Sequence, residues 1–450
     1  MHIPSLYLGT LNSERLWREP DISQLPAIAD PQADAIVNVM DELQFVFCDS
    51  PQDGLITRMP MDSSYKDYLG TLGFSFACNQ LPLIDTEVEA RSRQGICELL
   101  LSVARNTDYQ DLLVPPYILS PYSVEPFTEK LCQHYKLQGP NLNLEIVKKA
   151  NSKIFSHQLA KQLFPTTVGE VVCSASDLQE IGYRLLQSSL FLIKDEFGVS
   201  GKGNLLIDSS QVLQRIVAYI AKQEREGKRT QFLLEPLLDK QTDFSCQFEI
   251  GATGKTQILS IQTMQNSGFA FSSIRTAELS FQEFLDRARY FDWVQAIASE
   301  LYRVGYWGPV CLDSMILQSG QIVPLVEINA RKSMGFINYS TDRFLSQFST
   351  QGEMMFFSLG LSRQVTFSEL LQSLEQAEIL FRSDRPNGFL PLASNTFTIN
   401  CARHQASPIS SKAYKGRLYG SVIAEDTKQK QQILNEINHV FADLNIQKFN

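Results

Sequence analysis

The chain has 450 residues, of which 44% are hydrophobic and 20% are charged, and its formal net charge is −9. This balance is that of an ordinary globular protein, and the length suggests two or three domains. The negative charge argues against nonspecific binding to nucleic acid or to an acidic membrane. The sequence has no run of about 18 apolar residues, so we expect no membrane-spanning segment.

The eight cysteines are widely scattered, and no two of them form a C-x-x-C pair. Reduced, mostly buried thiols fit this spacing better than a disulfide framework or a zinc site does. The first nine residues lack the charged region and the long apolar region of a signal peptide. These features predict a cytoplasmic protein.

The first 140 residues have the pattern of a nucleotide-binding α/β domain without its phosphate-binding motif. Short apolar runs predict strands at residues 35–39, 43–48, 54–58 and 112–115. Apolar residues at helical spacing predict helices over residues 92–106 and 123–135. Because no G-x-G-x-x-G motif follows a predicted strand, we expect no dinucleotide site here. We interpret the region as scaffold, with a wall of the substrate pocket as the functional alternative.

A helix is predicted over residues 141–163, and it carries Lys153. A lysine side chain at this place can reach out from the helix toward an anion. Considered alone, however, Lys153 is better explained as a solvated surface lysine. A strand at residues 168–172 and a helix at residues 175–187 follow it.

A glycine-rich turn follows the apolar strand at residues 189–194, which ends in Lys194. Another strand is predicted after the turn, at residues 205–207. Backbone N–H groups of such a turn can lie along phosphate oxygens, and a lysine at its base adds positive charge. The turn is not a Walker A loop, because Lys202 is outside that motif and no helix follows directly.

The strand at residues 231–236 ends in Glu235 and Pro236. Such a strand end can present backbone and carboxylate acceptors to an adenine amine and to ribose hydroxyls. Residues 241–251 and 255–262 alternate as antiparallel strands do. A helix over residues 281–304 carries an apolar stripe, which we interpret as core and not as part of a cofactor site.

Two strands at residues 311–317 and 322–329 are joined by Gln-Ser-Gly-Gln, which predicts a β-hairpin. Glu327 and Asn329 share a face, since strand residues two apart point the same way. Asp313 joins them on that face only if the turn has an odd number of unpaired residues or the hairpin contains a bulge. Three oxygen-bearing side chains on one surface suit Mg²⁺, a hard ion with oxygen ligands.

The alternative is a hairpin whose acidic residues are merely solvated. For Asp313 alone the two interpretations are equally supported, whereas Glu-Ile-Asn-Ala-Arg directly after an apolar strand favours the ligand set. Arg331 and Lys332, followed by Gly335, are compatible with an anion pocket next to it.

The order of these features resembles the ATP-grasp superfamily. The shared pattern is a lysine-ended strand with a glycine-rich turn, then Glu-Pro, then an Asp, then Glu-x-Asn-x-Arg. The resemblance covers residues 141–361, about half of the chain. Within the superfamily, residues 112–140 and the Asn-Ser-Lys at residues 151–153 resemble the pre-ATP-grasp peptide ligases of the pheganomycin-ligase type.

The resemblance implies an α/β protein with an ATP-grasp fold. It implies a Rossmann-like pre-ATP-grasp domain at residues 1–140, an ATP-grasp domain at residues 141–365 and a small βα module at residues 366–450. The ATP-grasp domain would consist of a lid at about 165–235 and a metal-binding half at about 236–365. The C-terminal module would contribute to an acceptor pocket or a dimer face, with a purely structural role as the alternative.

The resemblance also implies cofactors and roles for single residues. The cofactors would be ATP and Mg²⁺, with Mn²⁺ as the alternative metal. The implied metal ligands are Asp313, Glu327 and Asn329, and the implied catalytic residues are Arg331, which would steady the reacting carboxylate or phosphate, and Lys194. The implied nucleotide-binding residues are Lys153, Lys194, Ser200, Gly201, Lys202, Gly203, Glu235, Pro236 and Leu237, with the turn at residues 200–203 closing as a lid.

The activity that the resemblance implies is ligation of a carboxylate to an amine, with ADP as the nucleotide product. The expected substrates are small amino acids or peptides. Alternatives are transfer of the acyl group to the thiol of a carrier protein, a small-molecule kinase, and a catalytically silent ATP-binding protein. The complete set of Asp313, Glu327, Asn329 and Arg331 argues against the silent protein.

Overall fold

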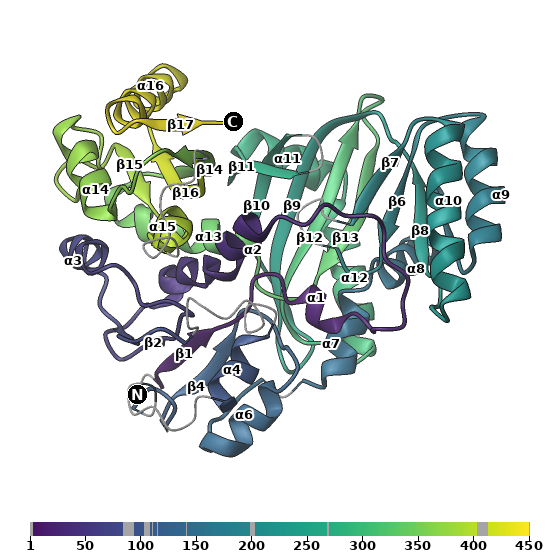
Figure 1. Ribbon diagram of the computed structural model, residues 1–450, viewed down its shortest axis with the longest axis horizontal. Helices are drawn as coiled ribbons and strands as arrows, with labels where there is room; N and C mark the ends of the chain where they lie inside the picture. The colour runs from purple at the N-terminus through teal and green to yellow at the C-terminus, as the bar shows by residue number, and fades with distance from the viewer. Residues whose placement is uncertain are drawn as a thin grey trace.

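The computed structural model describes residues 3–83, 94–102, 109, 111–114, 116–140, 142–198, 203–267, 270–402 and 413–449. Within these residues the strands form three β-sheets, which follow one another along the chain (Figure 1). None of the helices in the described ranges is long and apolar enough to cross a membrane.

The first sheet is parallel and has the strand order β3-β2-β1-β4. Its strands are β1 (Ser5–Leu8), β2 (Gly54–Leu55), β3 (Ala77–Cys78) and β4 (Ile118–Pro121). The accompanying helices are α1 (Glu14–Trp17), α2 (Pro31–Asn38), η1 (Met40–Phe47), α3 (Ser63–Thr71), α4 (Ile96–Ser102) and α6 (Thr128–Tyr135). A small core of Leu, Ile and Tyr side chains fills the space between the sheet and helices α4 and α6. The parallel sheet agrees with the predicted α/β class of this region.

The strands predicted at residues 35–39 and 43–48 are wrong, because these residues lie in α2 and the 3₁₀ helix η1. Asp30 caps α2 by accepting from the N–H of Ala33, and Pro31 occupies the first helical position. A short apolar run occurs both in buried strands and in buried helices, so the capping residues are needed to tell the two apart. The strand predicted at residues 112–115 is also wrong for its described residues, which lie in a turn before β4.

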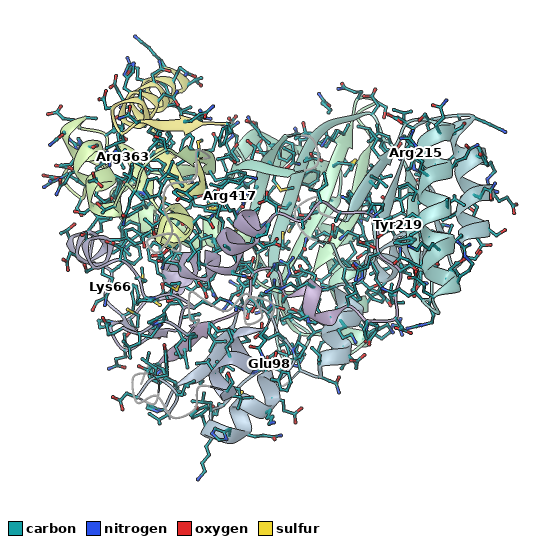
Figure 2. The ribbon with its side chains drawn as sticks, viewed as in Figure 1. Lys66, Glu98, Arg215, Tyr219, Arg363 and Arg417 are labelled. Carbon is teal, nitrogen blue, oxygen red and sulfur yellow. The ribbon has the colours of Figure 1, made fainter. Side chains whose placement is uncertain are left out.

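The second sheet is antiparallel, with the order β5-β8-β6-β7. Its elements are α7 (Leu144–Ala150), α8 (Lys153–Leu163), β5 (Glu170–Val172), α9 (Ala175–Leu186), β6 (Phe191–Asp195), β7 (Asn204–Ile207), α10 (Ser210–Arg225) and β8 (Phe232–Pro236). Helix α10 buries Leu213 and Ile216 in the core of this sheet and exposes Arg215 and Tyr219 on its outer side (Figure 2). The four predicted strands and the helix at residues 175–187 are confirmed.

The third sheet has nine strands and forms the centre of the molecule (Figure 1). Its order is β13-β12-β9-β10-β11-β14-β16-β15, and β17 also pairs with β14. The strands are β9 (Lys240–Ile250), β10 (Thr256–Ser267), β11 (Ala270–Thr276), β12 (Gly308–Leu317), β13 (Ile322–Asn329), β14 (Gly352–Leu361), β15 (Gly388–Pro391), β16 (Tyr414–Ile423) and β17 (Ile446–Lys448). Strands β15 to β17 of the C-terminal part therefore continue the sheet that carries the predicted metal ligands.

Helices cover both faces of this sheet. They are α11 (Leu279–Arg287), α12 (Tyr290–Arg303), α13 (Met334–Leu345), η3 (Ser346–Phe348), α14 (Phe367–Gln376), α15 (Asn395–Ala402) and α16 (Thr427–Asp443). The apolar stripe of α12 packs on the face of β9 and β12 that carries Phe244 and Leu312. The helix predicted over residues 281–304 is two helices, α11 and α12. Leu285, Val294 and Ile297 of the predicted stripe lie in the core as expected, whereas Phe284 is exposed. The division of the chain at residues 140 and 365 stays a prediction.

Glu42 of η1 connects the N-terminal part of the chain to the C-terminal part. Its buried carboxylate accepts from the N–H groups of Ser394 and Asn395 at 2.8 Å each, and from the Ser394 hydroxyl. Burial raises the pKa of Glu42 to about 8, although these hydrogen bonds oppose the shift.

Stability is expected to fall with pH because of Glu42. A carboxyl group whose folded pKa lies above its unfolded pKa contributes stability below the unfolded value and loses it as pH rises through the folded value. The free energy of unfolding should therefore decrease between about pH 4.5 and pH 8, and Glu42→Gln should flatten this decrease by on the order of 2 kcal/mol. Denaturant unfolding across this pH range measures the effect, with the exposed Glu129→Gln as control. Equal pH dependence in all three proteins would contradict the assignment.

Candidate active site

The hairpin of β12 and β13 places Asp313 directly opposite Glu327. The last register pair before the turn is Ile316 with Ile322, so the turn has an odd number of residues, and the register shifts between Asp313 and Met315. An odd turn and a bulge were the two alternative conditions under which the carboxylates share a face, and the odd turn is the one that applies. The register shift adds two residues on β13, so it leaves the facing of the side chains unchanged. The predicted hairpin is confirmed.

Asn329 completes a group of three oxygen-bearing side chains on this face. Its Nδ2 donates to Oδ2 of Asp313 at 3.0 Å, which aligns the amide with the carboxylate. Burial and the neighbouring Glu327 raise the pKa of Asp313 to about 7. Two carboxylates held this close repel each other, and a divalent cation with oxygen ligands would relieve the repulsion. The donor set therefore fits Mg²⁺.

The described residues contain no group of three or more His, Cys, Asp or Glu side chains that could hold a metal ion. The group on this hairpin has two carboxylates, and its third oxygen is an amide. Mg²⁺ is commonly bound by one or two carboxylates together with waters and phosphate oxygens, so two carboxylates suffice.

Lys153 is the first residue of α8 and points at the hairpin. Its Nζ donates to Oε1 of Glu327 at 2.6 Å and to the carbonyl oxygen of Gly198 at 2.7 Å. Its exposed fraction is only 5%, so the interpretation of Lys153 as a solvated surface lysine is wrong. Ser152 fixes the start of the helix by accepting from the N–H of Phe155. The lysine thus joins the start of the glycine-rich turn to β13, which carries two of the predicted metal ligands.

Lys194 lies at the end of β6 and forms an ion pair with Glu235 of the neighbouring β8. Burial acts to lower the pKa of Lys194, but the Glu235 carboxylate outweighs it, so the pKa is raised and the amine stays charged. His157 of α8 lies beside the pair, with Nδ1 3.9 Å from Oε1 of Glu235. Burial lowers the pKa of His157, which favours a neutral ring.

The other predicted nucleotide contacts that the structure describes lie at the ends of β8 and β6. Pro236 ends β8 directly after Glu235, and Leu237 follows with 39% of its surface exposed. The carbonyl of Gly203 accepts from the N–H of Asp195 at 2.7 Å, so the turn closes onto the end of β6. Ser200, Gly201 and Lys202 lie outside the described residues. Their predicted phosphate contacts stay a prediction.

Arg331 follows β13 directly and is buried, with 7% of its surface exposed. Its Nε and Nη2 both donate to Oε1 of Glu14, the former at 2.7 Å, and Nη2 also donates to Oδ1 of Asn329 at 3.0 Å. The guanidinium lies 5.9 Å from the ring centroid of Tyr122. Arg331 therefore contacts Asn329 of the predicted metal-ligand group on one side and Glu14, in the N-terminal part of the chain, on the other.

Glu14 and His157 are the site residues that sequence reasoning missed. Glu14 lies 317 residues before Arg331 in the chain, and nothing in its local pattern marks it as a partner of that arginine. His157 sits on the same helix as Lys153, four residues later. Helical spacing of i and i+4 was a usable signal for this neighbour.

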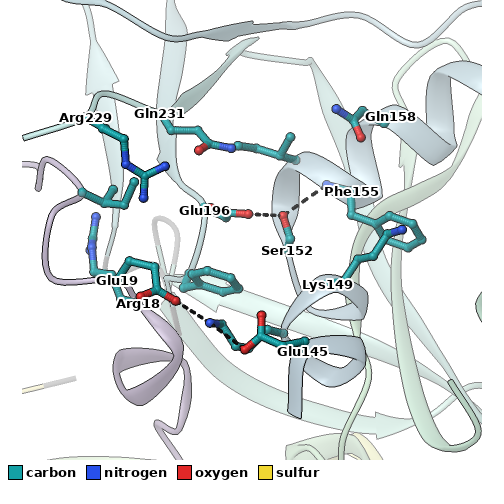
Figure 3. A pocket seen from close by; sticks show the side chains of 14 residues that line it. Arg18, Glu19, Glu145, Lys149, Ser152, Phe155, Gln158, Glu196, Arg229 and Gln231 are labelled. Carbon is teal, nitrogen blue, oxygen red and sulfur yellow. Dashed lines mark hydrogen bonds and ion pairs between the residues drawn. The ribbon is translucent and has the colours of Figure 1, made fainter. Parts of the chain in front are cut away.

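A cavity of about 400 Å³ lies next to the site (Figure 3). It is lined by residues of the N-terminal segment, of α7 and α8, and of the second sheet, including Arg18, Lys149, Ser152, Glu196 and Arg229. Ser152 donates to Oε1 of Glu196 across it. The predicted metal ligands are absent from its lining, so we assign this cavity no part in catalysis.

No model of a known protein family matches the chain. A curated relative is the [butirosin acyl-carrier protein]–L-glutamate ligase of Niallia circulans, which is 25% identical over 312 residues, or 68% of this chain and 67% of the relative. Among solved structures, the L-amino acid ligase from Bacillus licheniformis superposes with a TM-score of 0.50 at 14% identity and covers 99% of this chain and 98% of its own.

Two further solved structures have the same TM-score of 0.50. An N5-carboxyaminoimidazole ribonucleotide synthetase in complex with ADP is 9% identical and covers 90% of this chain and 95% of its own. The biotin carboxylase from Campylobacter jejuni is 11% identical and covers 99% and 92%. These likenesses show a common fold, which is the ATP-grasp fold. The chain thus shares the ATP-grasp fold with these structures, and its sequence is similar to that of a carrier-protein–L-glutamate ligase.

Proposed function

We propose that the protein is an ATP-dependent ligase that activates a carboxylate as an acyl phosphate and transfers the acyl group to the amine of an amino acid or peptide. The observation that carries the proposal is the contact of Lys153 with Glu327, opposite Asp313. A cation from α8 and two carboxylates from the central sheet thus converge on one point. Such a point can hold a metal and a polyphosphate together.

Asp313, Glu327 and Asn329 are the residues that would hold Mg²⁺. When bound, Mg²⁺ would neutralise charge on the phosphate oxygens of ATP. Lys153 and Lys194 contribute fixed positive charge toward the phosphates from α8 and β6. Glu235, Pro236 and Leu237 at the end of β8 would face the adenine and ribose. These assignments are supported by the neighbourhood of the elements, since β8 pairs with the strand that carries Lys194.

The reaction needs two anions, a carboxylate and a triphosphate, to approach closely. A carboxylate oxygen attacks the γ-phosphorus, and the bond from that phosphorus to the β,γ-bridging oxygen breaks, which yields an acyl phosphate and ADP. A neutral amine then attacks the acyl carbon and expels inorganic phosphate, and the amine loses a proton. Lys153, Lys194 and Arg331 would offset the repulsion between the two anions in the first step. Transfer also requires that the attacking carboxylate oxygen lie in line with the bond that breaks.

A second candidate is transfer of the acyl group to a carrier-protein thiol. It is favoured by the name of the curated relative, a carrier-protein–L-glutamate ligase. The activation step is the same for both acceptors, so the residues described above do not separate them. A small-molecule amine and a carrier-protein thiol differ in size, and only an acceptor assay distinguishes them.

Incubation with Mg²⁺-ATP, pooled amino acids and hydroxylamine tests the proposal. Hydroxylamine is a small nucleophile that traps an acyl phosphate as a hydroxamate. We expect ADP, phosphate and a hydroxamate whose acyl part identifies the donor. AMP and pyrophosphate would instead indicate adenylation and contradict the proposal. Replacing hydroxylamine by free amino acids, or by a carrier protein with its thiol cofactor, then separates the two acceptors.

A further inference from the structure

The N-terminal strap, which we define as residues 14–25, connects the central sheet to the second sheet. Figure 1 shows the chain leaving α1 toward β8 and returning to α2. Trp17 fixes its first part by donating from Nε1 to the carbonyl of Val124 at 3.1 Å, and its ring packs against that of Phe197. Through Trp17, the strap therefore contacts both Val124, in the N-terminal part of the chain, and Phe197, which follows β6 of the second sheet.

The first residue of the strap, Glu14, holds Arg331. The side chain of Glu14 is 6% exposed, and that of Arg331 is 7% exposed, so water does not screen the pair. One carboxylate oxygen accepts from both Nε and Nη2, which fixes the plane of the guanidinium. Nη2 also donates to Oδ1 of Asn329, whose Nδ2 donates to Asp313. A chain of hydrogen bonds thus runs from Glu14 through Arg331 to the metal-ligand group.

The residue after Arg331 is held by the same domain. Nζ of Lys332 donates to the carbonyl oxygen of Ser120 at 2.9 Å and to its hydroxyl at 2.8 Å, and it lies 4.6 Å from the ring centroid of Tyr7. The backbone N–H of Lys332 donates to the carbonyl of Tyr122 at 3.0 Å. The N-terminal part of the chain therefore holds both residues that follow Ala330, Arg331 through its side chain and Lys332 through its backbone and side chain.

The far end of the strap is built into the second sheet. Arg18 forms an ion pair with Asp195, the neighbour of Lys194 in β6, at 2.6 Å. Asp21 pairs with Arg229, and Gln24 exchanges two hydrogen bonds with Gln223. Leu25 is buried in the core of that sheet. This end stabilises the position of the strap without touching Arg331.

We infer that Glu14 is the positioning residue for Arg331, so that the N-terminal domain completes the active site instead of serving only as scaffold. The inference rests on the proposed function, because it assigns Glu14 to the step in which Arg331 faces the reacting carboxylate or phosphate. Glu14 acts through the arginine and not on the substrate. Without the Glu14 carboxylate, the guanidinium keeps its own charge but loses the charge-assisted hydrogen bonds that fix its plane.

Glu14→Gln tests the inference through hydroxamate formation. We expect kcat to fall about thirtyfold while KM for ATP stays within about twofold, because Lys153 and Lys194 are untouched. Glu14→Asp retains the carboxylate and should recover part of the loss. Asp21→Asn, which breaks the exposed pair at the other end of the strap, should leave kcat unchanged. In an Arg331→Gln background, Glu14→Gln should cause no further loss, since the residue acts only through Arg331.

Three results would overturn the inference. A wild-type kcat in Glu14→Gln would mean that Glu14 does not position Arg331. A full additional loss in the Arg331→Gln background would mean that Glu14 acts independently of Arg331, and an equal loss in Asp21→Asn would mean that the strap acts only on stability. Thermal unfolding of each variant corrects kcat for the folded fraction. If Glu14→Gln does not fold, Glu14→Asp decides, with at least a threefold loss of kcat expected. A wild-type protein that forms no hydroxamate would instead refute the proposed function itself.

Discussion

Glu327→Gln is expected to lower turnover by at least about a hundredfold while leaving the fold intact. Glutamine has the size of glutamate, but it removes the charge and one of the oxygens that would face the metal. Asp313 lies opposite on β12 and would then be the only carboxylate of the group. Lys153, whose Nζ lies 2.6 Å from Oε1 of Glu327, would also lose its anionic partner. Both changes act at the point where metal and phosphate would meet.

The loss of the ion pair needs its own control. Glu353 of β14 forms a carboxylate–lysine pair with Lys430, and the two side chains are 10% and 28% exposed. Glu327 and Lys153 are 26% and 6% exposed, so the two pairs are similarly buried. Glu353→Gln should therefore cost a comparable amount of stability, about 1 to 2 kcal/mol, without lowering kcat.

Steady-state hydroxamate formation and denaturant unfolding of both variants provide the comparison. An ion-pair role for Glu327 would give equal stability losses and no specific loss of kcat. A metal role gives the loss of kcat in Glu327→Gln alone, and half-maximal turnover of that variant should require a higher Mg²⁺ concentration. Near-normal turnover in Glu327→Gln would refute the metal assignment.

The hairpin of β12 and β13, with the predicted metal ligands on one face, could be predicted from the sequence because its information is local. Alternation of side chains places Glu327 and Asn329 on one face, and parity then restricts how Asp313 can join them. The observed odd turn satisfies that restriction, and the two-residue register shift does not alter it. The strands of the second sheet could be predicted equally well, since they are short apolar runs bounded by polar turns.

The environment of the site could not be predicted, because it depends on contacts between distant segments. Lys153 looks like a surface lysine until β13 packs beside α8 and buries it. Glu14 and Arg331 are 317 residues apart, and no local pattern relates them. The pairing of β14 with β16, which places the C-terminal part of the chain in the central sheet, is non-local in the same way.

The strand errors in the first domain have a different cause. Residues 35–39 and 43–48 are short apolar runs that are mostly buried, and burial alone does not separate a strand from a helix. Asp30 and Pro31 before α2 were the available helix signals, as an N-cap and a first helical position. In this region capping residues were more informative than hydrophobic runs.

Lys194→Met is expected to lower kcat/KM for ATP about a hundredfold. A buried charged amine that donates to a phosphate contributes more than a neutral hydrogen bond, and methionine retains its length without its charge. Lys194 is 9% exposed, and its ion pair with Glu235 keeps the amine charged within the second sheet. Lys161→Met, at an exposed position of α8, provides the matched control and should leave kcat/KM unchanged.

Glu235→Gln separates the phosphate role of Lys194 from a role in the ion pair alone. If Lys194 contacts phosphate, Lys194→Met should lower both kcat and the affinity for ATP, whereas Glu235→Gln should mainly raise KM for ATP, because Glu235 would face the adenine and ribose. If the pair only stabilises the sheet, the two variants should lose activity and stability equally, and the double variant should lose no more. Isothermal titration with ADP and with ATP adds a direct measure. A γ-phosphate contact predicts that Lys194→Met weakens ATP binding more than ADP binding, and equal weakening would assign the lysine to the α- and β-phosphates.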